Sequence, residues 1–213
     1  MNFSVGTSMC FIGPKKSGKS CAFKAMCIRK GGLLDKHDFV FIFCPLVNRD
    51  FYATFIESKF IIQGLDKELL DKITSRQAEI RNTFGSSRMP KILCCFDDIF
   101  SSRKARLDVF AEELLSVSRH YNISVVFLSQ SAAYLKPLLR NTQIISFIPS
   151  GVFLHSDRKL LIDSILLNFK LSEEQLHSIF EKTPKYTVIL CDMFRKTLDK
   201  YLAPRKLINY ELK

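Results

Sequence analysis

The chain has 213 residues, of which 47% are hydrophobic, with only 8 glycines and 7 prolines. Such a composition excludes a disordered or low-complexity chain, and the length suits one domain with a sizeable core. Lys and Arg total 32 against 21 Asp and Glu, and the resulting net charge of +11 favours a polyanionic partner without identifying it. We find neither an apolar run of the roughly 18 residues that span a bilayer nor a secretory signal, and therefore expect an intracellular protein that does not enter membranes.

The seven cysteines include no CxxC pair, and most of them lie within apolar runs. An odd number of cysteines in a chain of this length argues against a disulfide framework, and the spacing of zinc ligands is absent. We expect these residues to be buried free thiols that act as small hydrophobic side chains, as in a reducing compartment.

Short apolar runs rich in β-branched and aromatic residues recur along the chain, and we predict a strand at each. They are residues 9–12, 39–43, 92–96, 125–128, 144–148 and 187–191. Because the runs are apolar throughout rather than alternating, both faces of the sheet should be covered, which is typical of parallel strands between layers of helices.

Amphipathic stretches between these runs predict helices at residues 19–30, 66–84 and 105–119, and after a capping box formed by Ser172 and Gln175. The side chains expected to be buried in the second and last of these are Leu69, Ile73, Ile80 and Phe84, and Leu176, Ile179 and Phe180. Alternating strands and helices indicate a layered α/β domain. We place this domain at residues 1–194 and interpret residues 195–213 as a basic C-terminal tail.

Residues 13–20 match the phosphate-binding pattern G-x-x-x-x-G-K-[ST] in full, between a predicted strand and a predicted helix. The glycines let the backbone wrap so that its N–H groups face phosphate oxygens, and the helix adds its N-terminal dipole. Lys19 should reach the β- and γ-phosphates, and Ser20 should offer its hydroxyl to Mg²⁺. The expected nucleotide-binding residues are Gly13, Pro14, Lys15, Lys16, Ser17, Gly18, Lys19, Ser20 and Cys21. The alternative is a glycine-bearing turn that binds no nucleotide.

Polar side chains follow two of the other predicted strands. The strand at 92–96 is followed by Asp97, an expected indirect Mg²⁺ ligand, and Asp98, which would polarise the attacking water. Gln130 follows the strand at 125–128, and its amide can both donate and accept near a γ-phosphate or a water. The carboxyl ends of parallel strands meet at one edge of a sheet, beside the phosphate-binding loop. Such residues also cap turns, and that interpretation stays open, most of all for Gln130.

Two further stretches carry a family resemblance. Residues 118–130 read Ser-Arg-His-Tyr-Asn-Ile-Ser-Val-Val-Phe-Leu-Ser-Gln, and residues 134–141 read Tyr-Leu-Lys-Pro-Leu-Leu-Arg-Asn. With the phosphate-binding loop, they make the chain resemble the poxvirus-type genome-packaging ATPases of large DNA viruses, virophages and related elements, which belong to the FtsK–HerA superfamily. The likeness runs from about residue 8 to about residue 150, with a weaker match at 192–196.

The resemblance implies a RecA-like P-loop NTPase core, in which a mostly parallel central sheet is flanked by helices on both faces. It also implies an ATPase that uses ATP and Mg²⁺ and assembles into a homo-oligomeric ring, a pentamer or hexamer. Such a ring would push double-stranded DNA, irrespective of sequence, into a preformed capsid at its portal vertex. The protein would then act in the host cytoplasm or viral factory.

Site roles follow from the resemblance residue by residue. Lys19, Asp98 and Gln130 would serve hydrolysis, and Ser20 and Asp97 would serve the metal. Asp98 departs from many superfamily members, which carry Glu there.

A neighbouring subunit would supply an arginine to the site. Arg119 and Arg140 are the main candidates, with Arg103 and Arg106 less favoured.

DNA would be held through its phosphates by basic residues, for which the loops at 86–88 and 101–104 and the tail are candidates. Two other function classes stay open: a small P-loop kinase for a nucleoside or metabolite, and a non-hydrolysing assembly protein gated by nucleotide. A kinase would not need Asp97, Asp98 and Gln130, and a non-hydrolysing protein should have lost a catalytic acid.

Overall fold

A computed structural model describes residues 3–99, 105–149, 155–166, 169, 172–184 and 186–202 of the protein. Its centre is an eight-stranded sheet with the order β3-β2-β4-β5-β1-β6-β7-β8. The strands are β1 (Ser8–Ile12), β2 (Phe39–Cys44), β3 (Ile61–Gln63), β4 (Ile92–Asp97), β5 (Ile123–Ser129), β6 (Ile144–Phe147), β7 (Thr187–Asp192) and β8 (Thr197–Leu202). Strands β1 to β6 run parallel, whereas β7 and β8 join antiparallel at one end.

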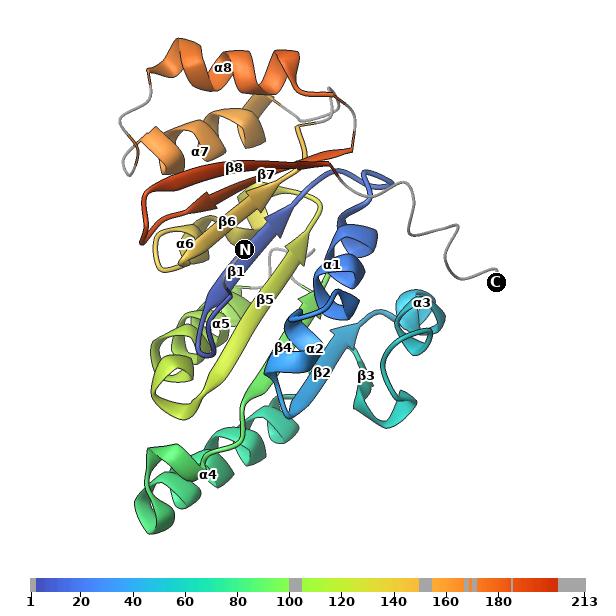
Figure 1. The fold of residues 1–213 in the computed structure, drawn as a ribbon, viewed down its shortest axis with the longest axis vertical. Helices are drawn as coiled ribbons and strands as arrows, with labels where there is room; N and C mark the ends of the chain where they lie inside the picture. The colour runs from blue at the N-terminus through green and yellow to red at the C-terminus, as the bar shows by residue number, and fades with distance from the viewer. Residues whose placement is uncertain are drawn as a thin grey trace.

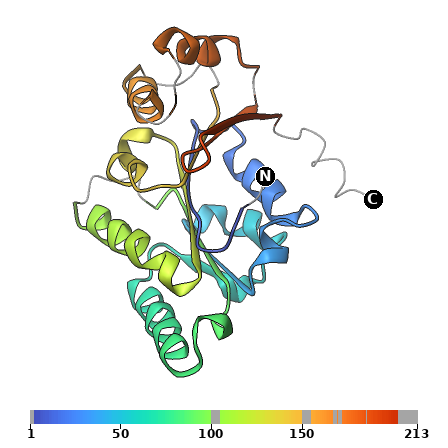
Figure 2. The same ribbon diagram turned by 60° about the vertical axis from the view of Figure 1, so that its left-hand side comes forward.

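Helices lie on both faces of this sheet (Figures 1 and 2). The α-helices are α1 (Lys19–Ile28), α2 (Leu33–Lys36), α3 (Arg49–Ala53), α4 (Lys67–Phe84), α5 (Ala105–Ser118), α6 (Lys136–Leu139), α7 (His155–Leu166) and α8 (Glu173–Lys182). The short 3₁₀ turns are η1 (Leu46–Asn48), η2 (Ser58–Phe60), η3 (Ser86–Arg88), η4 (Arg119–Tyr121) and η5 (Ala132–Leu135). One face carries α1, α2 and α3, and the other carries α4, α5 and α6, with α7 and α8 continuing that layer over β6 to β8.

The apolar runs are explained by these two layers, because every residue of β1, β4 and β5 is buried. Phe43, Phe96 and Phe127 stack on one another across β2, β4 and β5, with ring centroids 4.8 and 5.4 Å apart. Burial of this kind stabilises the strand ends that carry the polar residues. Six of the seven cysteines are buried free thiols, while Cys21 is exposed at the start of α1.

Strands β3 and β8 have no counterpart among the predicted strands. The tail expected from residue 195 is wrong at its start, because Thr197–Leu202 pairs along its whole length with β7. Tertiary pairing with an otherwise open strand edge explains β8, whose sequence shows no regular apolar alternation. Residues 203–213 of the expected tail lie outside the described residues.

The helix predicted at 66–84 is present as α4, but its buried face differs from the predicted stripe. Leu70, Ile73 and Gln77 are buried, whereas Phe84 is 66% exposed. The buried Gln77 amide donates to the carbonyls of two loops, those of Pro90 and Tyr121, at 2.7 Å each. The buried face of α4 is therefore not apolar throughout: it includes Gln77, whose two hydrogen bonds attach the helix to the loops beside the sheet.

The predicted capping box is present at the start of α8. The Ser172 hydroxyl accepts from the Gln175 backbone N–H at 3.2 Å, and the Gln175 side chain accepts from the Ser172 backbone N–H at 2.9 Å. Phe180 is buried against Phe147 of β6, while the side chain of Leu176 lies outside the described residues. Within the described ranges, no helix is long and apolar enough to cross a membrane.

Candidate nucleotide-binding site

The ends of three neighbouring strands meet at one edge of the sheet. In the strand register, Ile12 of β1 pairs with Ser129 of β5, and Asp97 of β4 pairs with Leu128. Backbone hydrogen bonds continue past the strands: Gly13 N–H donates to the Ser129 carbonyl at 3.1 Å, and the N–H that follows Asp97 donates to the Leu128 carbonyl at 2.9 Å. The structure thus brings the glycine-rich loop, the two acids and Gln130 to the same edge.

The loop after β1 wraps tightly before α1 begins. Ser17 N–H donates to the Pro14 carbonyl at 3.1 Å, and Lys16 and Gly18 have positive φ angles of 62° and 95°. No side chain caps the N-terminus of α1, which starts at Lys19. The first N–H groups of a helix have no intrahelical partner, so this end of α1 offers donors and a positive dipole to an anion.

Gly13 makes the loop compact enough to form a cradle. A Cβ atom at this position would lie 2.7 Å from Ser17 Oγ and 3.1 Å from Lys19 Cγ. Ser17 Oγ is buried and has no hydrogen-bond partner among the described atoms. A buried hydroxyl without a partner is costly, and here it lies in a loop whose backbone is shaped to receive oxygen atoms.

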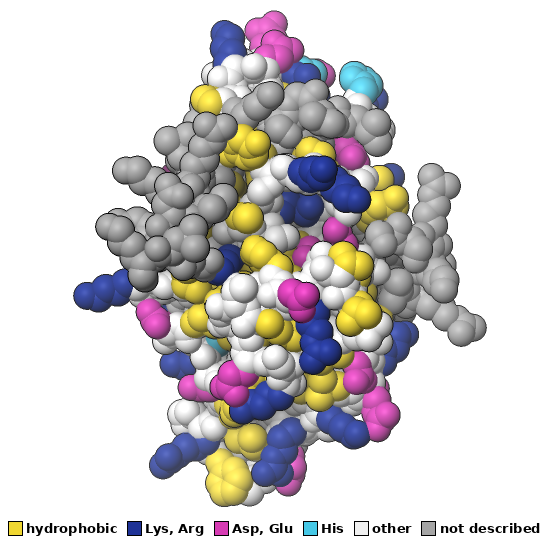
Figure 3. All heavy atoms as spheres, turned by 90° about the vertical axis from the view of Figure 1, so that its right-hand side faces the viewer, with side chains coloured by type: hydrophobic (Ala, Val, Ile, Leu, Met, Phe, Trp, Pro, Cys, Tyr) yellow, Lys and Arg dark blue, Asp and Glu magenta, His cyan; other side chains and the backbone are white. Residues whose placement is uncertain are grey.

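A pocket of about 300 Å³ opens beside this loop. Its lining residues are Lys16, Ser17, Gly18, Lys19, Ser20, Cys21, Asn48, Phe51 and Asp97. All but two of these were predicted from the sequence; Asn48 and Phe51 come from η1 and α3, which follow β2. Figure 3 views the side of the molecule to the right in Figure 1 and shows a group of Lys and Arg side chains in its upper half, with carboxylates just below.

Lys19 is only 6% exposed, whereas Lys15 and Lys16 are exposed. Burial lowers the pKa of Lys19, and the carboxylates of Asp98 and Asp97 oppose that shift. The two carboxylates therefore stabilise the charged form of Lys19 in the pocket, where its ammonium group can bind a more highly charged anion.

Asp97 is 1% exposed and lies at the end of β4. Its Oδ2 accepts hydrogen bonds from Tyr52 Oη at 2.8 Å and from Asn48 Nδ2 at 3.0 Å, while its Oδ1 is buried with no partner in the part of the chain that the structure describes. Burial and the neighbouring Asp98 carboxylate raise the pKa of Asp97, whereas the Tyr52 hydroxyl, the Lys19 ammonium and the Asn48 amide oppose that shift. The unpartnered oxygen makes Asp97 a suitable acceptor for a metal-bound water.

Asp98 and Gln130 form a pair next to the pocket. Gln130 Nε2 donates to Asp98 Oδ2 at 2.7 Å, and Asp98 adopts a positive φ of 53°. An aspartate in this sparsely populated region carries backbone strain, which is frequent at functional sites. Asp98 is half-buried and Gln130 is exposed, so both can reach water.

The chain after Gln130 is fixed by a residue that the sequence analysis missed. Asp157 of α7 is 2% exposed, and its Oδ1 accepts from Ser131 Oγ at 2.7 Å and from Ala133 N–H at 3.1 Å. This carboxylate thereby links the C-terminal helices to the segment that carries Gln130. Its partners lie more than twenty residues away in sequence, and no local motif marks it.

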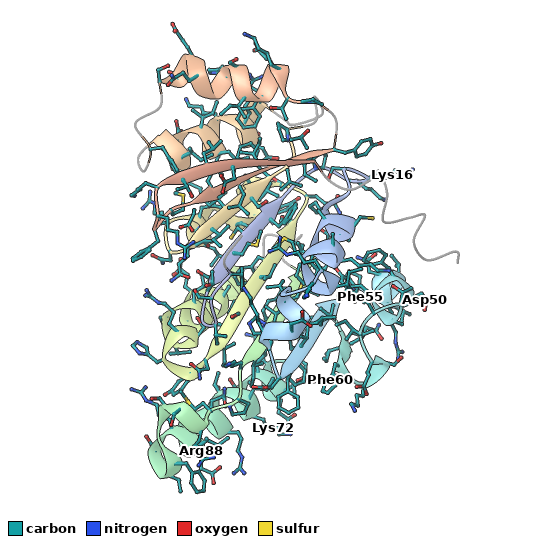
Figure 4. The ribbon with its side chains drawn as sticks, viewed as in Figure 1. Lys16, Asp50, Phe55, Phe60, Lys72 and Arg88 are labelled. Atoms are coloured by element: carbon teal, nitrogen blue, oxygen red, sulfur yellow. The ribbon has the colours of Figure 1, made fainter. Side chains whose placement is uncertain are left out.

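Arg119 and Arg140 are exposed at the opposite edge of the sheet, where β5 and β6 begin. Strand β5 has 7 residues, which corresponds to roughly 20 Å at about 3.3 Å per residue. Neither arginine therefore reaches the pocket of its own chain. Arg103 and the side chain of Arg106 lie outside the described residues. Figure 4 shows a further basic residue, Arg88 of η3, far from Lys16 of the glycine-rich loop along the long axis.

Asn48 and Tyr52 are site residues that sequence reasoning did not find. Both follow the end of β2, just as Asp97 and Gln130 follow β4 and β5. The rule that polar residues after parallel strands gather at one edge could have found them, but neither residue follows the strand directly: Asn48 is the last residue of η1, and Tyr52 lies in α3.

Comparison with protein families gives a match over nearly the whole chain. Residues 4–200 match the family model described as Poxvirus A32 protein. No curated protein is similar enough to be matched with this chain.

Solved structures provide the second comparison. The genome-packaging NTPase B204 of Sulfolobus turreted icosahedral virus 2, in complex with AMPPCP, has a TM-score of 0.63 at 13% identity and covers 92% of this chain and 97% of its own. The DNA-packaging ATPase B204 of Sulfolobus turreted icosahedral virus has a TM-score of 0.63 at 16% identity, with 93% and 98% covered. The cytoplasmic domain of the Type VII secretion ATPase EccC of Thermomonospora curvata has a TM-score of 0.59 at 15% identity, with 92% of this chain and 25% of that chain covered. The predicted fold class, a P-loop core with a mostly parallel sheet, is confirmed.

Proposed function

Because this chain belongs to the family of the poxvirus A32 packaging ATPase, we propose that it is one subunit of a homo-oligomeric ring that hydrolyses ATP to move double-stranded DNA into a viral capsid. The observation that carries the proposal is the convergence of the glycine-rich loop, the buried Asp97 and the Asp98–Gln130 pair at one edge of the sheet. This set provides a triphosphate cradle and a water-activating pair in one place.

The cradle binds the nucleotide through its backbone and one cation. N–H groups at the start of α1 face the phosphates, and Lys19 compensates their charge from within the pocket. Lys15 and Lys16 are exposed and add positive potential around the entrance. The B204 structures of Sulfolobus turreted icosahedral virus 2 were determined with AMPPCP and with ATP-γS, which favours ATP as the ligand of this fold.

The donor set also fits Mg²⁺, a hard cation that prefers oxygen ligands. Ser20 would offer its hydroxyl, and Asp97 would act through its buried Oδ1, for which the described residues provide no partner. When bound, the ion neutralises part of the charge that develops on the phosphate oxygens.

Hydrolysis requires a water aligned with the γ-phosphorus. The Asp98 carboxylate accepts a hydrogen bond from that water, and Gln130, already paired with Asp98, orients it. A new bond forms between the water oxygen and phosphorus while the bridge to the β-phosphate breaks, which yields ADP and phosphate. The backbone hydrogen bond from Asp98 N–H to the Leu128 carbonyl and the buried Asp157 beyond Gln130 hold the pair in place.

A ring explains why the basic candidates Arg119 and Arg140 lie far from their own pocket. Head-to-tail contacts in a cyclic assembly place different faces of neighbouring subunits together. An arginine at the edge opposite the pocket can therefore serve only a neighbour's nucleotide, as a trans-acting finger does. A pentamer and a hexamer both satisfy this geometry.

DNA would be held through its phosphates without base contacts. Among the described residues, Arg88 in η3 and Arg195 and Lys196 in the turn before β8 are exposed basic candidates. The loop at 101–104 and the basic residues of 203–213 lie outside the described residues. Packaging would take place where capsids and their portal vertices assemble, in the host cytoplasm or viral factory.

The test measures ATP hydrolysis by the full chain with Mg²⁺ and double-stranded DNA, in the absence of any nucleoside or metabolite that could accept the phosphate. Wild type should release ADP and phosphate in equal amounts. Asp98→Asn should bind ATP but hydrolyse it roughly 10²–10⁴ times more slowly, and Asp71→Asn, an exposed aspartate on α4, is the matched control. ADP formed only when a nucleoside acceptor is added would identify a kinase, and tight ATP binding without turnover would identify a nucleotide-gated assembly protein; either result would overturn the proposal.

A further inference from the structure

A buried polar network lies directly beneath the pocket. Tyr52 is 0% exposed, and its Oη donates to Asp97 Oδ2 at 2.8 Å. Asn48 Nδ2 donates to the same oxygen at 3.0 Å. The two donors occupy one side of the carboxylate and leave Oδ1 buried with no partner among the described residues.

Ser20 of the glycine-rich loop lines the same pocket as Asp97. Burial raises the pKa of Tyr52, and the nearby Ser20 hydroxyl opposes that shift, as a group that can donate toward Tyr52 Oη does. A carboxylate oxygen only accepts, so the Tyr52 hydroxyl proton is used on Asp97. Toward Ser20, Tyr52 Oη can therefore act only as an acceptor, a geometry that leaves the lone pairs of Ser20 Oγ available to a cation.

Helix α3, which carries Tyr52, is fixed against α1. Lys24 of α1 donates from Nζ to Thr54 Oγ1 at 2.9 Å, and the same ammonium lies 5.8 and 5.3 Å from the ring centroids of Phe51 and Phe55. Figure 4 shows Asp50 of α3 and Phe55, which follows this helix, on the side of the sheet that also carries α1. Tyr52 is therefore presented by an element that is tied to the helix of the glycine-rich loop.

We propose that Tyr52, assisted by Asn48, is a positioning residue that aligns Ser20 and Asp97 as the pair of groups that receive the divalent cation of a metal–nucleotide complex. Removing the Tyr52 hydroxyl takes away the shorter of the two hydrogen bonds to Asp97 Oδ2 and leaves Asn48 as the one remaining donor shown on that oxygen. The carboxylate can then rotate, and the polar group beside Ser20 is lost. Partners behind metal-binding groups commonly alter metal affinity by about 10- to 100-fold when removed.

This inference rests on the proposed nucleotide site, but its test does not depend on hydrolysis or DNA. Binding of a fluorescent ATP analogue to the full chain is measured against Mg²⁺ concentration and, separately, in EDTA. Tyr52→Phe should raise the Mg²⁺ concentration for half-maximal binding by about tenfold or more and leave the affinity in EDTA within about twofold of wild type. Asn48→Ala should shift the Mg²⁺ requirement in the same direction by a smaller factor.

Tyr121→Phe, at the opposite end of the sheet in η4, is the matched control and should leave both affinities unchanged. A wild-type Mg²⁺ requirement in Tyr52→Phe, or an equal loss of affinity in EDTA and in Mg²⁺, would overturn the positioning role. If Tyr52→Phe does not fold, Asn48→Ala decides by the same two readouts. A protein that hydrolyses no ATP but shows the Tyr52-dependent Mg²⁺ requirement would refute the motor function and leave this inference intact.

Discussion

Adding a single methyl group to the glycine-rich loop should weaken nucleotide binding far more than it weakens the fold. In Gly13→Ala, the new Cβ would lie 2.7 Å from Ser17 Oγ, 3.1 Å from Lys19 Cγ and 3.5 Å from Ile148 Cβ. The first two distances are shorter than ordinary van der Waals contact, so Ser17 and the stem of Lys19 must move. Overpacking of this kind costs about 1–3 kcal/mol. This cost applies to the loop conformation that binds nucleotide. The affinity for ATP should therefore fall by about 5- to 150-fold, at 1.4 kcal/mol per factor of ten.

The control for this substitution is Gly64→Ala. Gly64 has a φ of 73°, and no described atom lies within 4 Å of the added Cβ. The cost of this substitution is therefore backbone strain of about 1–2 kcal/mol, at a position that does not line the pocket. Titration with a fluorescent ATP analogue and urea unfolding separate the two effects. Gly64→Ala should lose stability and retain affinity, whereas Gly13→Ala should lose affinity. Unchanged affinity in Gly13→Ala would refute the cradle assigned to this loop.

Three further predictions concern residues outside the loop. Burial lowers the pKa of His37, which is 7% exposed, so the unfolded chain binds the proton more readily and the free energy of unfolding should fall as pH drops below about 6.5. Urea unfolding at about pH 7.5 and about pH 5.5 should show a smaller loss in His37→Gln than in wild type, and equal losses would contradict this. Asp157→Ala should lower the free energy of unfolding by about 1–3 kcal/mol because the Ser131 hydroxyl loses its buried acceptor; an unfolding curve like that of wild type would count against the link. Mixing Arg119→Ala subunits with Lys19→Ala subunits should restore ATP hydrolysis that neither shows alone, and a mixture as inactive as its components would remove Arg119 from the list of trans-acting fingers.

The sequence carried enough information for the sheet and most of the pocket because both depend on local patterns. Uninterrupted apolar runs such as Ile92–Phe96 exist because helices cover both faces of the sheet. The polar residues after them meet at one edge because parallel strands share a direction. The pairing of Asp98 with Gln130 follows from the same rule.

Other features depend on tertiary contacts that no local pattern records. Strand β8 forms because β7 offers a free edge, so its own sequence needs no alternation. The sequence predicts Phe84 in the core, but this end of α4 extends beyond the sheet and the ring is exposed. Tyr52 contacts Asp97 across 45 positions of sequence, and Asp157 contacts Ser131 across 26. Such long-range polar contacts are fixed by the packing of whole elements, so the residues look ordinary until the fold is known.

The central claim is that ATP turnover by this protein is coupled to double-stranded DNA. The most direct measurement is the steady-state rate of ATP hydrolysis by the full chain with and without double-stranded DNA, over a range of salt concentrations. The rate should rise with DNA of any sequence, the stimulation should weaken steeply as salt increases because phosphate contacts release counterions, and Asp98→Asn should abolish it. Hydrolysis that is the same with and without DNA at every salt concentration, in protein that binds ATP normally, would contradict the account.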